Sequence, residues 1–160
     1  MTVPDTLTPA DREHMEHALR LAWDTLAAGN SPFAAVLVAA DGRVLATGQN
    51  AFAQSGDPTS HAELDAIRAV ADTDRGALLG ATMYASGEPC PMCSAALAWA
   101  RVSRVVYGAA APDIRAIYPS PVSFTLRCAE VIAAADADID VTGPVLGEEG
   151  LAPFHEAASS

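Results

Sequence analysis

The chain has 160 residues, of which 51% are hydrophobic and 18% are charged. This length and balance fit one globular domain over residues 1–160 and exclude a disordered chain. Twenty acidic residues stand against nine basic residues, all of them arginine, which gives a formal net charge of −11. Nucleic-acid binding draws on clustered basic side chains that neutralise phosphates, so we expect a small-molecule ligand and no nucleic acid.

Hydropathy and cysteine usage bear on the location of the protein. No apolar stretch reaches the ~18 residues needed to cross a bilayer, so we expect no membrane contact. The first residues, Met1 to Asp5, lack the basic and apolar regions of a secretory signal. Three cysteines, two of them in a C-x-x-C pattern, indicate metal ligands in a reducing compartment rather than a disulfide framework. We therefore expect a cytoplasmic protein.

The first predicted elements are a helix and a pair of strands. Thr8 can cap a helix whose apolar residues recur at helical spacing until Gly29. Phe33 to Ala40 is predicted as a strand that turns at Asp41-Gly42 into a second strand over Val44 to Gln49.

The remaining elements alternate between helices and strands. We expect a loop over Asn50 to Thr59, a helix capped by Ser60 and running to about Val70, a strand over Thr82 to Ala85, a helix from Cys90 to about Ala100, a strand over Val102 to Tyr107, a loop over Ala109 to Pro121, a helix over Val122 to Ala135, a strand over Ile139 to Val145 and a terminal helix over Leu151 to Ala158. This order predicts an α/β fold, a three-layer αβα sandwich around a mixed five-stranded sheet.

Two short motifs carry the chemistry, His61-Ala62-Glu63 and Pro89-Cys90-Pro91-Met92-Cys93. His61, Cys90 and Cys93 are predicted to bind Zn²⁺, because two cysteines about 300° apart on one helix turn point the same way. A helix N-terminus also favours their thiolate forms. A catalytic zinc site keeps one position open for water, whereas a structural site is closed by four protein ligands.

Glu63 is predicted to be the proton carrier of this site rather than a ligand. With His61 in the first turn of the helix, Glu63 lies about 200° around the helix from it and can reach toward the water. Two alternatives stay open. One is a structural site closed by Cys128, His14, His17 or His155, and the other is a redox C-x-x-C without metal.

These motifs resemble the zinc-dependent nucleobase and nucleoside deaminases, whose signature is H-x-E…P-C-x-x-C. The similarity extends over roughly residues 31 to 110, through Ser31-Pro32-Phe33-Ala34-Ala35-Val36, Gly48-Gln49-Asn50, Asp57-Pro58-Thr59-Ser60 and Glu88. It points to the branch that holds guanine deaminases, fungal-type cytosine deaminases and tRNA adenosine deaminases. The resemblance implies the cytidine deaminase-like fold, zinc as cofactor and a homodimer.

The resemblance also implies roles for single residues. An activated water attacks the ring carbon that bears the exocyclic amine, while Glu63 protonates the neighbouring ring nitrogen and passes a proton to the departing ammonia. Asn50 matches the asparagine that hydrogen-bonds the base, although it could also be a turn residue. The Ala62 backbone N–H is similarly placed to hold a substrate oxygen or ring nitrogen.

Aromatic residues complete the expected substrate contacts. Phe33 lies in a matching segment, and Tyr118 can offer an aromatic face to the base. Phe154 belongs to the C-terminal segment 147–160, which resembles a helix that closes the active site, sometimes from a partner subunit. Its alternative role is to pack on the core.

Two departures from the family pattern concern the substrate. Ala34 stands where many relatives have glycine, which could tighten the floor of the pocket. Guanine deaminases carry an acidic residue beside an aromatic one late in the loop before residue 121, whereas Pro119 and Ser120 follow Tyr118 here. Asp113 lies earlier and is expected to be a solvated loop residue. This difference weakens the case for guanine as the main substrate.

We therefore expect a hydrolytic deaminase of free nucleobases or related heterocycles of the cytosine, guanine or triazine type. The alternative is a tRNA adenosine deaminase, which predicts a basic C-terminal helix. The tail instead carries Glu148-Glu149 and ends in Ala157-Ala158-Ser159-Ser160. A third reading is a zinc-stabilised binding protein without catalysis, in which Glu63→Ala would leave the biological activity intact.

Overall fold

The elements of the chain follow one another in an alternating order. The computed structural model describes residues 7–160, so the Met1 to Asp5 segment and the expected lack of a signal there lie outside the described residues. The elements are α1 (Pro9–Ala27), β1 (Ala34–Val38), β2 (Val44–Gln49), α2 (Phe52–Ser55), α3 (Ala62–Asp74), the 3₁₀ helix η1 (Arg75–Leu78), β3 (Thr82–Gly87), α4 (Pro91–Ala100), β4 (Arg104–Ala109), α5 (Ala111–Ile117), α6 (Cys128–Ala134), β5 (Asp140–Thr142) and α7 (Gly147–Ala158). In residues 7–160 no helix combines the length and apolar character that a bilayer crossing requires.

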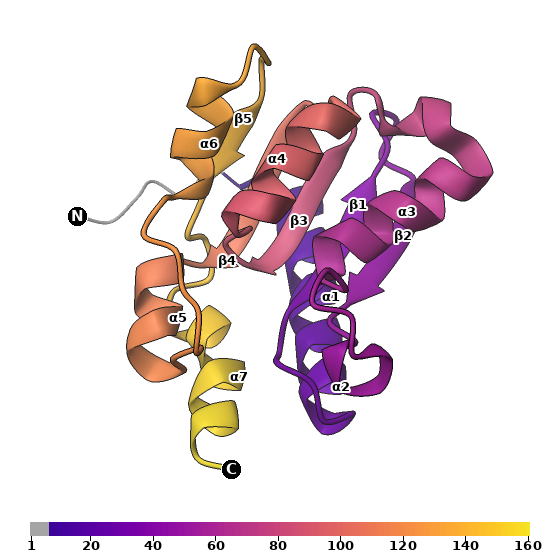
Figure 1. Cartoon of the computed structure of the whole chain (residues 1–160). Helices are drawn as coiled ribbons and strands as arrows, with labels where there is room; N and C mark the ends of the chain where they lie inside the picture. The colour runs from indigo at the N-terminus through magenta and orange to yellow at the C-terminus, as the bar shows by residue number, and fades with distance from the viewer. Residues whose placement is uncertain (1–6) are drawn as a thin grey trace.

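The strands form one mixed sheet in the order β2-β1-β3-β4-β5. β1 pairs antiparallel with β2 and β3, whereas β4 pairs parallel with β3 and β5. Helices α3, α4 and α6 lie over one face of this sheet and α1 over the other (Figure 1). The predicted three-layer α/β sandwich with a mixed five-stranded sheet is confirmed.

The core is divided by the sheet, because successive side chains of a strand point to opposite faces. Leu37 of β1 packs in the cluster that includes Val70 of α3 and Leu97 of α4. Its neighbour Val36 packs with Met15 and Leu19 of α1 on the opposite face. β1 is buried along its whole length. Its position between β2 and β3, with helices on both faces, explains why its sequence is a continuous apolar run.

Local signals predicted the first elements well. Thr8 caps α1 and forms a capping box with Asp11, because each side chain accepts a hydrogen bond from the backbone N–H of the other residue. The strands β1 and β2 also lie within or at the predicted ranges. These elements depend on residues close to one another in sequence, which a pattern can reveal.

Later boundaries differ from the prediction. Helices α2 and α5 lie inside segments that the sequence predicts as loops, α6 begins at Cys128 rather than Val122, and α7 begins at Gly147 rather than Leu151. The starts of α5 and α6 both donate backbone N–H groups to Glu88, which is 23 and 40 residues away in sequence. A cap supplied from so far along the chain leaves no local pattern.

Candidate metal centre and active site

The first metal-site residue lies where α3 begins against β2. His61 is the N-cap of α3 and has an extended backbone, so it precedes the first turn in which the sequence placed it. Ser60 is not the cap as predicted, because its hydroxyl donates to the Asp65 carboxylate at 2.9 Å. Gly48 of β2 allows the close approach. A Cβ there would overlap the Ala62 carbonyl oxygen and lie 2.8 Å from the Ala62 carbonyl carbon.

The two cysteines lie at the start of α4. Cys90 is the N-cap, Pro91 occupies the first helical position, and Cys93 follows in the first turn. Ser94 closes this turn, because its hydroxyl donates to the Pro89 carbonyl oxygen at 3.1 Å and its backbone N–H donates to the Cys90 carbonyl oxygen at 2.8 Å. Proline at the first position suits a helix start, since its missing N–H needs no partner there.

The three predicted ligands come together with the dimensions of a zinc site. His61 Nδ1 lies 3.6 Å from Cys90 Sγ and 3.5 Å from Cys93 Sγ, and all three ligand atoms lie within 4.8 Å of one another. Zinc bonds of typical length at tetrahedral angles require a nitrogen–sulfur separation of about 3.5 Å. Two soft sulfurs and one imidazole are also a donor set that zinc prefers. The residues therefore fit this ion.

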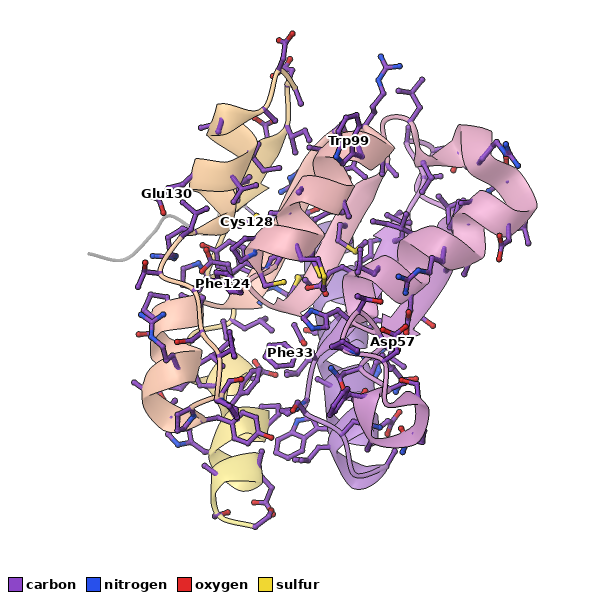
Figure 2. All side chains as sticks on the ribbon, viewed as in Figure 1. Phe33, Asp57, Trp99, Phe124, Cys128 and Glu130 are labelled. Atoms are coloured by element: carbon purple, nitrogen blue, oxygen red, sulfur yellow. The ribbon has the colours of Figure 1, made fainter. Side chains whose placement is uncertain are left out.

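Within residues 7–160, the cluster contains three protein ligands. Among residues 7–160, no other histidine, cysteine or carboxylate joins His61, Cys90 and Cys93. This excludes the alternative of a closed structural site, whose fourth ligand would be Cys128, His14, His17 or His155. Cys128 is fully buried beside α4, and burial raises its pKa to about 11 (Figure 2). One coordination position is left for water or substrate.

Burial sets the protonation properties of Glu63. Its side chain is in the first turn of α3, and only 5% of the residue is exposed. Desolvation raises the pKa of Glu63 to about 7, so the carboxyl group exchanges a proton readily at neutral pH. A hydrogen bond from the Cys93 thiol lowers the pKa of Cys90 to about 4, and a hydrogen bond with Cys90 raises the pKa of His61. Hydrogen bonding within the motif thus favours the thiolate form of Cys90, the form that binds zinc.

Two predicted substrate contacts lie at the ends of elements, Ala62 at the start of α3 and Asn50 directly after β2. Ala62 is buried and is the first residue of α3, so its N–H has no acceptor within the helix. Asn50 follows β2, and its N–H donates to the Phe33 carbonyl oxygen at 3.0 Å. Its side-chain oxygen accepts from the Phe52 N–H at 3.2 Å, so Asn50 does have the turn role that the sequence left open.

The three predicted aromatic residues form one cluster. The Phe154 ring lies 5.1 Å from the Phe33 ring and 6.4 Å from the Tyr118 ring. Phe154 itself is fully buried and packs on Ile114, whereas Phe33 and Tyr118 are half-buried. The core-packing role of Phe154 is therefore present, and its ring supports the two more accessible aromatics.

Sequence reasoning missed three residues that shape the site. Gly48 and Glu88 stand inside the motifs but received no role, although a glycine near a strand end can indicate a close approach. Ser31 was also overlooked, and its hydroxyl lies 3.1 Å from the Tyr118 hydroxyl. Asp113 is exposed on α5, as expected of a solvated residue.

Comparison with known families identifies the domain. The cytidine and deoxycytidylate deaminase zinc-binding region matches residues 8–109. The chain belongs to this deaminase family. Zinc is the cofactor of the family, and His61, Cys90 and Cys93 are positioned to bind it. The predicted resemblance is therefore confirmed.

The relatives of this chain include proteins that act on different substrates. It is 42% identical to the guanine deaminase of Bacillus subtilis over 106 residues, which are 62% of this chain and 64% of that protein. It is 28% identical to a probable cytosine deaminase of Schizosaccharomyces pombe over 152 residues, covering 92% and 91% of the two chains. It is 39% identical to a tRNA-specific adenosine deaminase of Haemophilus influenzae over 100 residues, covering 62% and 58%.

Coverage of other relatives differs widely. The chain matches 20% of the length of a tRNA(Ile)-lysidine synthase of Deinococcus deserti, with 41% identity over 104 residues and 64% of this chain. It therefore spans about a fifth of that relative. The guanine deaminase structure from Nitrosomonas europaea superposes with a TM-score of 0.77 at 25% identity, covering 100% of this chain and 87% of that one. The cytidine deaminase-like fold is thus shared by the part of this chain that the structure describes.

Proposed function

We propose that this deaminase hydrolyses free nucleobases or related heterocycles of the cytosine, guanine or triazine type and releases ammonia. The observation that carries the chemistry is the three-ligand cluster of His61, Cys90 and Cys93 beside the buried acid Glu63. The net charge of −11 supports a small substrate, since a chain this acidic repels a polyanion.

Glu63 is the proposed catalytic residue. When bound, zinc supplies a Lewis acid that activates water as the nucleophile. Glu63 takes one proton of the attacking water and donates it to the ring nitrogen next to the attacked carbon. It later takes the second proton, from the oxygen that has added to the ring, and carries it to the departing amine. Because burial raises its pKa to about 7, Glu63 can both accept and donate a proton near neutral pH.

The neighbouring residues are proposed to orient the base. The Ala62 N–H, free at the start of α3, donates to a ring nitrogen or an exocyclic oxygen. The Asn50 side chain uses its oxygen for the Phe52 N–H, which directs its amide group as a donor to the base. Phe33 and Tyr118 provide aromatic faces, supported by Phe154 of α7. By this arrangement α7 closes one side of the site from within the same chain.

The decisive experiment is an ammonia-release screen of purine, pyrimidine and triazine bases with the zinc-loaded protein. We expect release from at least one free base and none from the Glu63→Ala variant, which retains the three metal ligands. Absence of release from every base by the zinc-loaded wild type would refute the proposal. If the wild type released no ammonia and the Glu63→Ala variant kept the biological activity of the protein, a zinc-stabilised binding protein would be favoured instead.

The second candidate is deamination of adenosine in tRNA. It is favoured by the 39% identity to the tRNA-specific adenosine deaminase of Haemophilus influenzae. Against it, the first turn of α7 contains Glu148 and Glu149, which would repel phosphates. An anticodon stem-loop belongs in the same screen. Inosine formation in the stem-loop, without ammonia release from free bases, would reverse the order of the two candidates.

We further propose a homodimer that forms through the exposed face of α4. Trp99 is 87% exposed and Met92 is 38% exposed. They lie seven residues apart and hence on the same side of the helix. Trp99 stands near the end of α4 remote from Phe33 (Figure 2), whereas Met92 lies between the two cysteine ligands, so a partner on this face would reach from the far end of α4 to the edge of the metal motif. Trp99→Glu should convert a dimer to a monomer in sedimentation velocity, and unchanged sedimentation would exclude this face.

We also propose a cytoplasmic location, because zinc-binding cysteines must stay reduced.

A further inference from the structure

A buried carboxylate stands next to the metal motif without a role in the chemistry proposed above. Glu88 follows the last residue of β3 and precedes Cys90 by two positions, and its side chain is only 1% exposed. Its backbone N–H donates to the Ala109 carbonyl oxygen at 2.8 Å, which continues the pairing of β3 with β4. The backbone of Glu88 is therefore fixed to the sheet directly before a zinc ligand.

Two other parts of the chain converge on this carboxylate. Its Oε2 accepts a hydrogen bond from the backbone N–H of Ala111, the first residue of α5, at 2.8 Å. Its Oε1 accepts from the backbone N–H of Cys128, the first residue of α6, at 3.1 Å. The Arg127 Nε donates to the two oxygens at 2.8 and 3.0 Å. Backbone donors and a cation thus satisfy both oxygens of one buried group.

The residues that bond to Glu88 flank a single segment, residues 111–127. Ala111 begins this segment, Arg127 ends it, and Cys128 follows directly after it. This 111–127 segment consists of α5 and a stretch from Tyr118 to Arg127 that lacks helix and strand. Its side chains Ile114 and Tyr118 pack in the aromatic cluster that includes Phe33. Most of the stretch after Tyr118 is exposed, so few core contacts hold it.

We propose that Glu88 is a positioning residue, which fixes the substrate-contacting 111–127 segment relative to the metal centre. The inference rests on the proposed function, because that function assigns Tyr118 to the base. Arg127 also receives a role. Its guanidinium pairs with Glu88 and compensates the buried carboxylate.

Glutamine is an informative replacement, because it keeps the size of the side chain and removes half of its acceptor capacity. Its NH₂ group must face either the Ala111 N–H or the Cys128 N–H, so one end of the segment loses its partner. The metal ligands are not changed. Tyr118 should then occupy more positions relative to the zinc, which weakens binding of the base more than it slows the chemical step.

The matched control is Asp11→Asn. Asp11 is another buried carboxylate, 4% exposed in its side chain and paired with Arg104 Nη1 at 2.6 Å, but it lies on α1, on the opposite face of the sheet. For Glu88→Gln we expect KM for the base to rise about tenfold, kcat to change less than about threefold, and zinc to remain at one per chain. Asp11→Asn should lower stability and leave KM within about twofold.

Hydrogen–deuterium exchange supplies a readout that needs no substrate. The amides of residues 111–127 should exchange about tenfold faster in Glu88→Gln, with α1 unchanged. Arg127→Gln keeps the carboxylate and both backbone donors, so it should shift KM and exchange in the same direction by less. If Glu88→Gln does not fold, Arg127→Gln tests the proposal in its place.

The proposal is overturned if KM and exchange of the segment match those of the wild type, or if zinc is lost instead. A wild type that deaminates no free base would refute the proposed function alone. The exchange of residues 111–127 would still decide whether Glu88 holds the segment.

Discussion

The contact between Ser31 and Tyr118 joins two walls of the site at the level of single atoms. Their hydroxyl groups lie 3.1 Å apart, although the residues are 87 positions apart in sequence. Ser31 precedes β1, whereas Tyr118 follows α5. The hydrogen bond therefore fixes the Tyr118 side chain next to the segment that carries Phe33.

We expect Ser31→Ala and Tyr118→Phe each to raise KM for the base about three- to fivefold, since each removes one net hydrogen bond of about 1 kcal/mol. The double variant should resemble either single variant, because both remove the same interaction. Steady-state kinetics on the three variants measures the coupling. Additive effects would show that the two hydroxyl groups act independently.

At this scale the metal ligands could be predicted and the hydroxyl pair could not. His61, Cys90 and Cys93 occur in two short motifs whose spacing suits one ion, so their meeting follows from the chemistry of zinc. Ser31 and Tyr118 have no such shared partner. Only the fold brings them together, and neither residue type indicates the contact by itself.

The packing of α3 on β2 decides where His61 and Glu63 lie. Because Gly48 has no side chain, the helix start lies directly against the strand. Any Cβ at this position meets backbone atoms of Ala62, which cannot rotate away as a side chain could. The strand–helix distance is thus determined by one glycine.

Gly48→Ala should therefore move the start of α3 and weaken the metal site. We expect a loss of about 3 kcal/mol in the free energy of unfolding and about tenfold weaker zinc binding, from overpacking at a rigid contact. Gly76→Ala is the matched control, since the nearest atom to its Cβ would be 4.0 Å away. Denaturant unfolding and a zinc-indicator titration measure the two effects. Equal behaviour of the two variants would contradict this account.

Elements whose ends are capped locally were predictable, and those capped from a distance were not. The capping box of Thr8 and Asp11 lies within four residues of sequence, so α1 could be placed from its pattern. The starts of α5 and α6 depend on Glu88. Sequence periodicity therefore placed α6 too early and missed α5.

Over the whole molecule, one buried ion pair connects α1 to the sheet on the side away from the zinc. Asp11 accepts hydrogen bonds from Arg104 at 2.6 Å and from the Tyr84 hydroxyl at 2.7 Å. Burial alone would raise the pKa of Asp11, but the hydrogen bonds from Arg104, Tyr84 and Thr8 outweigh it and hold the pKa well below its usual value. The folded state therefore favours the ionised form.

This shift makes stability depend on pH in a defined direction. The contribution of Asp11 is fully present above the pKa of an unfolded aspartate, about 3.9, and is lost as the pH falls further toward the folded pKa. Asp11→Asn should cost about 2 kcal/mol at pH 7, since Arg104 is partly exposed, and progressively less below about pH 4. Urea unfolding from pH 3 to pH 7 tests this. A constant difference between the two proteins would contradict it.

The spacing of the metal ligands has a mechanical consequence. His61 is 29 residues from Cys90 and 32 from Cys93. A bound ion would therefore link the starts of α3 and α4 and close a loop of chain between them. Removal of the ion with a chelator should lower the melting temperature. If free zinc was a thousandfold above its Kd before removal, the protein loses about 4 kcal/mol of stabilisation. The ion would then stabilise the fold as well as take part in catalysis, so a demetallated sample would be less stable as well as inactive.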